Sequence, residues 1–249
     1  LEDKLVEQGL ATEGLAVDGS RPTSVKTRIL AGGGETVKQQ VVRVDKLETK
    51  AISRELETRL LAYIRDLIGE LDGILLSDYG NGVLTDRLRK EVIALAHKED
   101  KIIAVDSRYQ LPSFAGITIA TPNRSETESI VGFELDSPER IKEAGWQLKE
   151  KLAAEAVLIT LGGEGMQLFT DEKTAHIPAS NYTEVYDVTG AGDTVIGTLV
   201  LALAAGADFL TAAKLANHAA GVVVRKMGVA TVSPAELEAA IRGGDKDEQ

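Results

Sequence analysis

Short apolar runs typical of β-strands alternate along this chain with longer segments that repeat their apolar residues every three to four positions, as helices do. Strands are predicted at 73–76, 101–106, 117–121 and 156–160, and helices at 53–67, 84–97 and 137–151. Parallel strands need a long crossover, usually a helix, before the chain can return to the same edge of a sheet. The alternation therefore predicts an α/β protein of three layers, α/β/α, with a mostly parallel central sheet.

The two ends of the chain carry different patterns. Near the start, 24–31 and 39–44 alternate as strands on either side of three consecutive glycines, which predicts a hairpin. A second hairpin is predicted at 165–177, and helices are predicted at 191–205, 209–226 and 234–242. We expect a single domain over 1–249 with a charged tail at 243–249. Residues 1–9 resemble a helix already under way, so we expect an N-terminal part of the domain to lie outside this sequence.

The composition narrows the classes of function. With 28 basic and 39 acidic residues the formal net charge is −11, which argues against nucleic acid or an anionic membrane as a partner, because both attract a basic surface. No run reaches the roughly 18 to 20 apolar residues that span a bilayer, and no signal peptide pattern is present. The chain has no cysteine, which excludes disulfides and thiolate metal sites. We expect a cytoplasmic protein that acts on a small molecule.

The strongest chemical signal is the run D-V-T-G-A-G-D at 187–193, which leads directly into an apolar helical segment. Gly190, Ala191 and Gly192 have little or no side chain, so their N–H groups can approach an anion closely at a helix N-terminus. Asp193 follows in the first turn, where a carboxylate can take a proton from a hydroxyl that attacks a bound phosphate. An ordinary glycine-rich turn with an acidic first turn would have the same run. The chain contains no Walker A motif.

This run resembles the D-T-G-A-G-D signature of the ribokinase-like (PfkB) carbohydrate kinases, and the resemblance extends over most of the chain. It implies a ribokinase-like fold and transfer of the γ-phosphoryl group of ATP to a sugar hydroxyl. It also implies that Asp193 is the catalytic base and that the N–H groups of Gly190, Ala191 and Gly192 form the anion hole. ATP and Mg²⁺ are the implied nucleotide and metal ion.

Residues 121–126, T-P-N-R-S-E, follow a predicted strand and resemble the N-x-x-E motif of the same family. The resemblance implies that Asn123 and Glu126 position magnesium and the nucleotide phosphates, with Glu126 acting through water. Magnesium prefers oxygen ligands and retains several waters, which suits an amide and a carboxylate. A residue that caps a helix, followed three positions later by a glutamate, produces the same string, so a helix start remains the alternative.

Two further strings resemble segments that line the nucleotide site of the family. In L-I-T-L-G-G-E-G-M at 158–166, the resemblance places Thr160, Gly162 and Gly165 near ATP, although a hairpin turn would also contain these glycines. In K-L-A-N-H-A-A-G at 214–221, Asn217 resembles the helix residue beside the adenine. Helix packing would explain Asn217 equally well.

Within the family, three stretches resemble the D-glycero-β-D-manno-heptose 7-phosphate kinases of ADP-heptose synthesis: V-K-T-R-I at 25–29, Q-Q-V-V-R-V-D at 39–45 and S-D-Y-G-N-G-V-L at 77–84. They imply transfer to the anomeric hydroxyl of a heptose 7-phosphate. Asn81 and the run D-S-R-Y-Q at 106–110 depart from that subfamily, which has Lys and D-P-K there. A fructose-phosphate or ribose kinase of the same family, or a nucleotide-binding protein without catalysis, therefore remains an alternative.

The acceptor side has two kinds of candidate residue. Asp78 and Asp106 end strands and could hold sugar hydroxyls or cap helices. The candidates for contact with a phosphate on the sugar are four cations, each of which could also be a solvated surface charge: Lys26, Arg28, Arg43 and Arg108. The resemblance also implies a homodimer through paired β lids, and it places an early substrate motif and some of the β lid outside this sequence.

Overall fold

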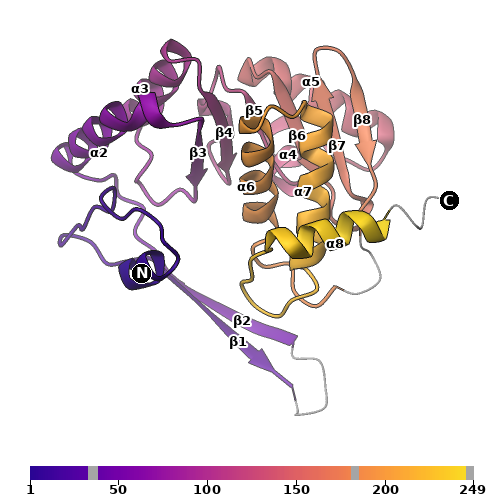
Figure 1. The fold of residues 1–249 in the computed structure, drawn as a ribbon, viewed down its shortest axis with the longest axis horizontal. Helices are drawn as coiled ribbons and strands as arrows, with labels where there is room; N and C mark the ends of the chain where they lie inside the picture. The colour runs from indigo at the N-terminus through magenta and orange to yellow at the C-terminus, as the bar shows by residue number, and fades with distance from the viewer. Residues whose placement is uncertain (33–38, 181–184, 245–249) are drawn as a thin grey trace.

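A six-stranded sheet lies at the centre of the protein, between two layers of helices (Figure 1). The structure, a computed structural model, describes residues 1–32, 39–180 and 185–244. Its strands run in the order β3 (Gly73–Asp78), β4 (Ile102–Ser107), β5 (Ile119–Ala120), β6 (Ala156–Thr160), β7 (Met166–Thr170) and β8 (Thr174–Ile177). The pairs from β3 to β6 are parallel, and the hairpin of β7 and β8 adds two antiparallel pairs at one edge. The mostly parallel sheet predicted from the sequence is confirmed.

The helices form the two outer layers. In chain order they are α1 (Glu2–Glu7), α2 (Arg54–Leu67), α3 (Asp86–Lys98), α4 (Arg124–Val131), α5 (Pro138–Leu152), α6 (Ala191–Ala204), α7 (Phe209–Val223) and α8 (Pro234–Gly244). Helices α2 to α5 belong with one hydrophobic core and α6 and α7 with the other. Neighbouring residues of a strand contribute to opposite cores, because side chains alternate across a sheet: Ile103 and Val105 of β4 face the first core and Ala104 the second.

Local signals explain where several helices begin. The hydroxyls of Ser53 and Thr85 accept N–H groups of the first turns of α2 and α3, as the sequence predicts for N-cap residues. Several elements differ from the expectation, among them α4, which was predicted only as an alternative helix start, and α7, which ends at Val223 and not at 226. Strand β5 is shorter than the predicted strand at 117–121. Helix α8 continues through Gly243 and Gly244, where a tail was expected, and the rest of that tail, 245–249, lies outside the described residues.

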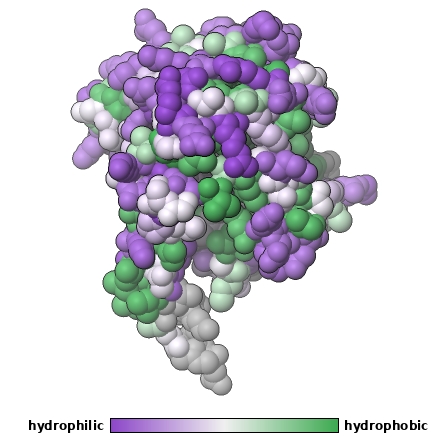
Figure 2. Space-filling model, turned by 90° about the vertical axis from the view of Figure 1, so that its left-hand side faces the viewer, coloured by the Kyte–Doolittle hydropathy of each residue, from purple (hydrophilic) through white to green (hydrophobic). Residues whose placement is uncertain are grey.

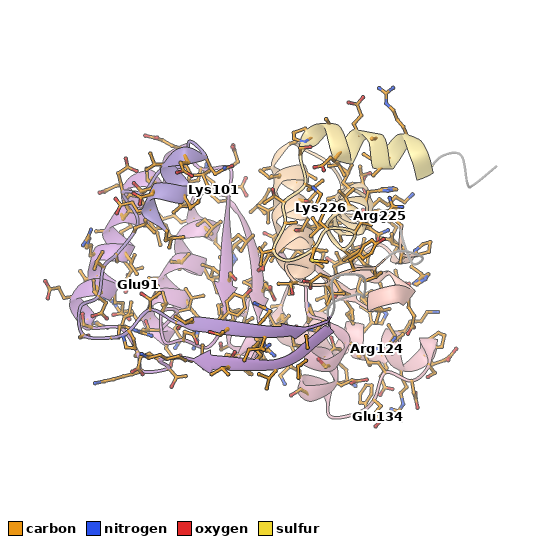
Figure 3. All side chains as sticks on the ribbon, turned by 90° about the horizontal axis from the view of Figure 1, so that it is seen from below. Glu91, Lys101, Arg124, Glu134, Arg225 and Lys226 are labelled. Atoms are coloured by element: carbon orange, nitrogen blue, oxygen red, sulfur yellow. The ribbon has the colours of Figure 1, made fainter. Side chains whose placement is uncertain are left out.

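Two strands stand apart from the central sheet. β1 (Val25–Ala31) and β2 (Gln39–Lys46) pair antiparallel, as predicted, and form a ribbon that we call the lid ribbon. It runs below the sheet in Figure 1 and crosses in front of it when the molecule is seen from below in Figure 3. Most of its predicted glycine loop lies outside the described residues. Within the described part of the chain, no helix is long and apolar enough to cross a membrane.

Candidate active site

Two pockets adjoin at the carboxyl ends of the parallel strands, where open α/β sheets bind their ligands. The first, which we call the acidic pocket, has a volume of about 600 Å³. Its charged and amide side chains are Asp78, Asp106, Arg108, Asn123, Glu126 and Asp193. The second, which we call the apolar pocket, has a volume of about 240 Å³ and lies between the 160–166 turn and helices α6 and α7. Thr160, Val188 and Gly192 line both pockets, so a ligand could extend from one into the other.

The N-terminus of α6 points into this junction. Gly190 is the N-cap residue, with a left-handed φ of 85° that favours glycine, and no side chain caps this helix. The N–H of Ala191 donates to the carbonyl of Val188 at 3.2 Å. The N–H groups of Gly190 and Gly192 have no partner within the part of the chain that the structure describes. Two of the three amides predicted for the anion hole are therefore open in this structure, and the third is already paired.

Asp193 lies in the first turn of α6 and lines the acidic pocket, beside the open amides. Its carboxylate accepts the hydroxyl proton of Tyr79, whose oxygen is 3.0 Å from Oδ1 and 3.3 Å from Oδ2. Tyr79 follows β3 directly and was not predicted from the sequence as a site residue. The available signal was its place after Ser77 and Asp78 at the end of a predicted strand, since strand ends carry ligand contacts in α/β folds.

Burial, together with the negative charges of Glu126, Asp193 and Asp78, raises the pKa of Asp106 to about 6. Burial and the negative charge of Asp193 raise the pKa of Tyr79 to about 12, so its hydroxyl remains a donor at neutral pH. Asp78 is held firmly: its Oδ1 accepts the N–H of Gly80 and its Oδ2 accepts the Ser107 hydroxyl, both at 2.9 Å. In the acidic pocket, hydrogen bonds thus fix the Asp78 carboxylate, and the negative charges of its neighbours act on the buried Asp106.

Asn123 and Glu126 form the helix start that was the alternative interpretation of their string. Asn123 Oδ1 accepts the N–H of Glu126, and Glu126 Oε2 accepts the N–H of Asn123, both at 2.9 Å, which is a capping box. Both residues nevertheless line the acidic pocket. A backbone bridge between Asn123 and Thr160 holds α4 against the end of β6. The cap and a role at the pocket are therefore compatible.

The acidic pocket suits a hard cation such as magnesium. Asp106, Asn123, Glu126 and Asp193 all present oxygen atoms, which are the ligands that magnesium prefers. A bound cation would also relieve the repulsion among carboxylates that adds to burial in raising the pKa of Asp106. Across residues 1–32, 39–180 and 185–244, no three acidic or histidine side chains converge closely enough to hold an ion alone. Waters and oxygens of a ligand would complete its coordination.

The apolar pocket contains the remaining residues predicted for nucleotide contact: Thr160, Gly162, Gly165 and Asn217. Gly165 has a φ of 88°, and a Cβ there would lie 2.1 Å from the carbonyl oxygen of Ile177, so only glycine fits this turn. The side-chain amide of Asn217 donates to the carbonyl of Pro178 at 2.8 Å and fixes Asn217 in the pocket wall. The structure brings all four residues together.

The four predicted cations differ in their surroundings. Arg108 lines the acidic pocket, and Lys26 places its ammonium 4.4 Å from the centre of the Tyr79 ring. Hydrogen bonds from Thr189 hold the pKa of Asp187 below its usual value, and the charge of Arg28 adds to this effect. Arg43 forms two hydrogen bonds with Asp45, at 2.8 and 2.9 Å. Arg43 is thus already paired, whereas Lys26 and Arg108 lie at or beside the acidic pocket.

A model of the pfkB family of carbohydrate kinases matches residues 1–236. The chain belongs to this family. This pfkB carbohydrate kinase chain is 40% identical over 243 residues to the bifunctional protein HldE of Desulfatibacillum aliphaticivorans, covering 97% of this chain and 49% of that protein. The chain thus spans about half the length of the curated relatives it matches.

Solved structures agree with the ribokinase-like fold of the family. The ribokinase of Giardia lamblia has a TM-score of 0.77 at 18% identity, covering 97% of this chain and 78% of that one. The Arabidopsis thaliana ribokinase complexed with ribose and ATP has a TM-score of 0.73 at 19% identity, with the same two coverages, 97% and 78%. The ribokinase-like α/β fold expected from the sequence is confirmed.

Proposed function

We propose that residues 1–249 form a single kinase domain that transfers the γ-phosphoryl group of ATP to a hydroxyl of a sugar phosphate. The observation that carries this proposal is the junction of the two pockets at the N-terminus of α6. Gly192 lines both pockets, and Asp193 faces the acidic one. A phosphoryl group held at the helix end would lie between a nucleotide in the apolar pocket and an acceptor in the acidic pocket.

In this reaction Asp193 accepts the proton of the acceptor hydroxyl as the hydroxyl oxygen attacks the γ-phosphorus. The new O–P bond forms while the bond from phosphorus to the β–γ bridging oxygen breaks, and its electron pair leaves with ADP. The amides of Gly190 and Gly192 stabilise the charge on the transferred group. Bound magnesium supplies further neutralisation of phosphate charge, and Asn123 and Glu126 would hold it, largely through waters.

For the acceptor we propose a heptose 7-phosphate, phosphorylated at its anomeric hydroxyl. The strings at 25–29, 39–45 and 77–84 support this choice, as do the HldE relatives at about 40% identity. Asp78 and Asp106 would bind sugar hydroxyls in the acidic pocket. Lys26 and Arg108 would bind the phosphate already on the sugar, because Arg108 lines the acidic pocket and Lys26 lies over Tyr79, which lines it too.

An acceptor panel tests the proposed reaction. The purified protein is incubated with ATP, magnesium and either D-glycero-β-D-manno-heptose 7-phosphate, fructose 6-phosphate or ribose, and ADP release is measured. We expect release to depend on the heptose phosphate, with a new anomeric phosphate in the phosphorus NMR spectrum. Preference for fructose 6-phosphate or ribose would assign the chain to another branch of the family. Binding of ATP without any sugar-dependent ADP release would favour a non-catalytic nucleotide-binding protein.

We also propose that the lid ribbon pairs with that of a second copy of the chain. Residues opposed in its register point to the same side, so Val25, Ile29, Val42 and Val44 share the face away from Lys26 and Arg43. All four are exposed, by 46% to 56%. Hydrophobic side chains gather on the ribbon beside the grey atoms of its tip in Figure 2. An exposed apolar face of this kind indicates a contact surface.

A further inference from the structure

Tyr79 is the only side chain among the described residues that donates a hydrogen bond to the proposed catalytic carboxylate. The two residues are 114 positions apart in the chain. The single hydroxyl proton lies between the two oxygens of Asp193, nearer to Oδ1 at 3.0 Å than to Oδ2 at 3.3 Å. A donor in this position limits rotation of the carboxylate. It leaves Oδ2, the more weakly bound oxygen, for an incoming hydroxyl.

The backbone that carries Tyr79 is fixed on both sides. Asp78, which precedes it, is buried and bound to the Ser107 hydroxyl of the neighbouring strand. Gly80, which follows it, donates its N–H to Asp78 Oδ1 and has a φ of 69°. A Cβ on Gly80 would lie 2.9 Å from the ring of Tyr109, so this glycine allows the close approach of the two loops. Tyr79 is therefore presented to Asp193 from a rigid support.

The ring of Tyr79 also contacts the lid ribbon. Lys26 of β1 lies over the ring face, with 4.4 Å from its nitrogen to the ring centre, which is a cation–π contact. The base of the ribbon is attached to the same loop: Arg21 donates to the carbonyls of Glu48, Lys50 and Asn81. Ile52, beyond β2, donates its N–H to the carbonyl of Gly82 at 2.9 Å. The ribbon and the Tyr79 loop are thus joined at the ring and at the base.

We propose that Tyr79 is a positioning residue for Asp193, and that Lys26 makes this positioning depend on the lid ribbon. The inference rests on the proposed function, in which Asp193 is the base. With the ribbon in place, Lys26 holds the ring, the ring holds its hydroxyl against Oδ1, and Oδ2 faces the acceptor. Displacement of the ribbon frees the ring and with it the carboxylate.

The first test is Tyr79→Phe, which keeps the ring under Lys26 and removes only the hydroxyl. We expect kcat to fall about 10- to 100-fold, while KM for ATP stays within about two-fold, because the apolar pocket is untouched. Thermal stability should remain near that of the wild type. A kcat within about two-fold of the wild type would overturn the proposal. So would a rise in KM for the sugar alone, because Tyr79 would then only bind substrate.

The second test separates the two possible roles of Lys26. If Lys26 acts through the ring, Lys26→Met lowers kcat in the wild type but has no further effect on kcat in a Tyr79→Leu background, where the ring is gone. KM for the sugar phosphate should rise in both backgrounds, because Lys26 is also proposed to bind that phosphate. If Lys26 acts only on the sugar phosphate, the variant raises KM by the same factor in both backgrounds and leaves kcat unchanged in both, and the link to the ribbon is wrong. Lys46→Met is the matched control: Lys46 lies on the opposite face of the same ribbon, and its variant should behave like the wild type.

The orientation of the Asp193 side chain can be measured without any catalysis, so it separates failure of this inference from failure of the proposed function. Crystal structures of the wild type and of Tyr79→Phe would compare the Asp193 side chain directly. We expect one orientation in the wild type, and a different or divided orientation in the variant. An unchanged Asp193 in Tyr79→Phe would refute the positioning role even if the wild type shows no sugar-dependent ADP release. If that release is absent but the orientation of Asp193 changes in the variant, the proposed function is wrong, whereas the positioning of Asp193 by Tyr79 is supported.

Discussion

At the scale of single residues, the four carboxylates of the acidic pocket have different surroundings. Asp78 accepts two hydrogen bonds, Glu126 accepts one from Asn123 and Asp193 accepts one from Tyr79. No group in the described part of the chain donates a hydrogen bond to Asp106, which is why burial and repulsion dominate there. Asp193 and Asp106 differ in this way and are therefore suited to different tasks. Asp193 is suited to take a proton, and Asp106 to accept a cation or a sugar hydroxyl.

Asp193→Asn tests the proposed base. The amide keeps the shape of the carboxylate but cannot take a proton, so we expect kcat to fall by about 100- to 10,000-fold. Affinity for ATP, measured by calorimetry, should change little, since the apolar pocket is left intact. Equal losses of turnover and of ATP affinity would indicate that Asp193 has a structural role instead.

Asp106→Asn should stabilise the empty protein in a manner that depends on pH. The pKa of Asp106 is about 6 in the folded protein and near 3.8 without the fold. Between these values the folded protein keeps a proton that the unfolded chain has lost, so the free energy of unfolding falls as the pH rises. Above pH 6 the whole of this loss of stability is present.

We therefore expect Asp106→Asn to raise the free energy of unfolding by on the order of 2 kcal/mol at pH 8 and by much less at about pH 4. Thermal melts across this pH range measure the difference. Asp72→Asn, at an exposed position, is the control and should show no such pH dependence. Equal effects of Asp106→Asn at both pH values would contradict the assignment of a raised pKa.

At the scale of elements, the N-terminus of α6 has room where a phosphoryl group would lie. A Cβ built on Gly192 meets nothing within 4 Å, so no packing reason requires glycine there. The same is true of Gly197, further along the same helix and outside both pockets. These two glycines therefore differ in their place relative to the pockets and not in the space around them.

Alanine at these two positions should separate stability from activity. We expect both variants to fold, and Gly197→Ala to gain roughly 0.5–1 kcal/mol, because alanine favours a helix over glycine. Gly192→Ala should lower kcat/KM at least about 10-fold, since its methyl group occupies the approach to the amides. Chemical denaturation and steady-state kinetics check the two effects. Full activity in Gly192→Ala would show that no phosphoryl group approaches this helix end.

At the scale of the whole molecule, the lid ribbon stands outside both hydrophobic cores and depends on few contacts with the rest of the protein. One face of the ribbon carries Lys26, Arg43 and Asp45, with Lys26 over the Tyr79 ring, and the other, which we call the outer face, carries the exposed Val25, Ile29, Val42 and Val44. A two-stranded ribbon is at best marginally stable in water by itself. Pairing of two outer faces would therefore stabilise the ribbon and bury its apolar side chains together.

Charged residues on the outer face should abolish this pairing. Ile29 and Val42 are opposed in the register, so Ile29→Glu with Val42→Lys places opposite charges side by side and preserves the ribbon itself. We expect a dimer for the wild type and a monomer for the double variant in light scattering. Leu201→Lys, at a site 73% exposed on α6, is the control and should remain dimeric. A monomeric wild type, or a double variant that stays dimeric, would contradict the proposal.

Features that depend on near neighbours in the chain could be predicted from the amino-acid order alone. Periodicity predicted the strands and helices, Ser53 and Thr85 marked helix starts, and the run at 187–193 marked the start of α6. These signals are local because capping, helical periodicity and backbone freedom are set by residues a few positions apart. The alternation of strands and helices was enough to predict the layered, mostly parallel sheet.

Contacts between side chains that are distant in sequence could not be predicted in this way, because they depend on the whole fold. The fold brings Tyr79 to Asp193 and Lys26 to the Tyr79 ring, and neither contact has a signal in the local pattern. The bond from Arg43 to Asp45 is local by contrast, because the two residues are two positions apart on one strand. Pairings between distant residues depend on strand order and on the packing of loops that are far apart in sequence. Several side chains of similar charge occur at strand ends and in loops, so the local sequence does not say which of them will meet.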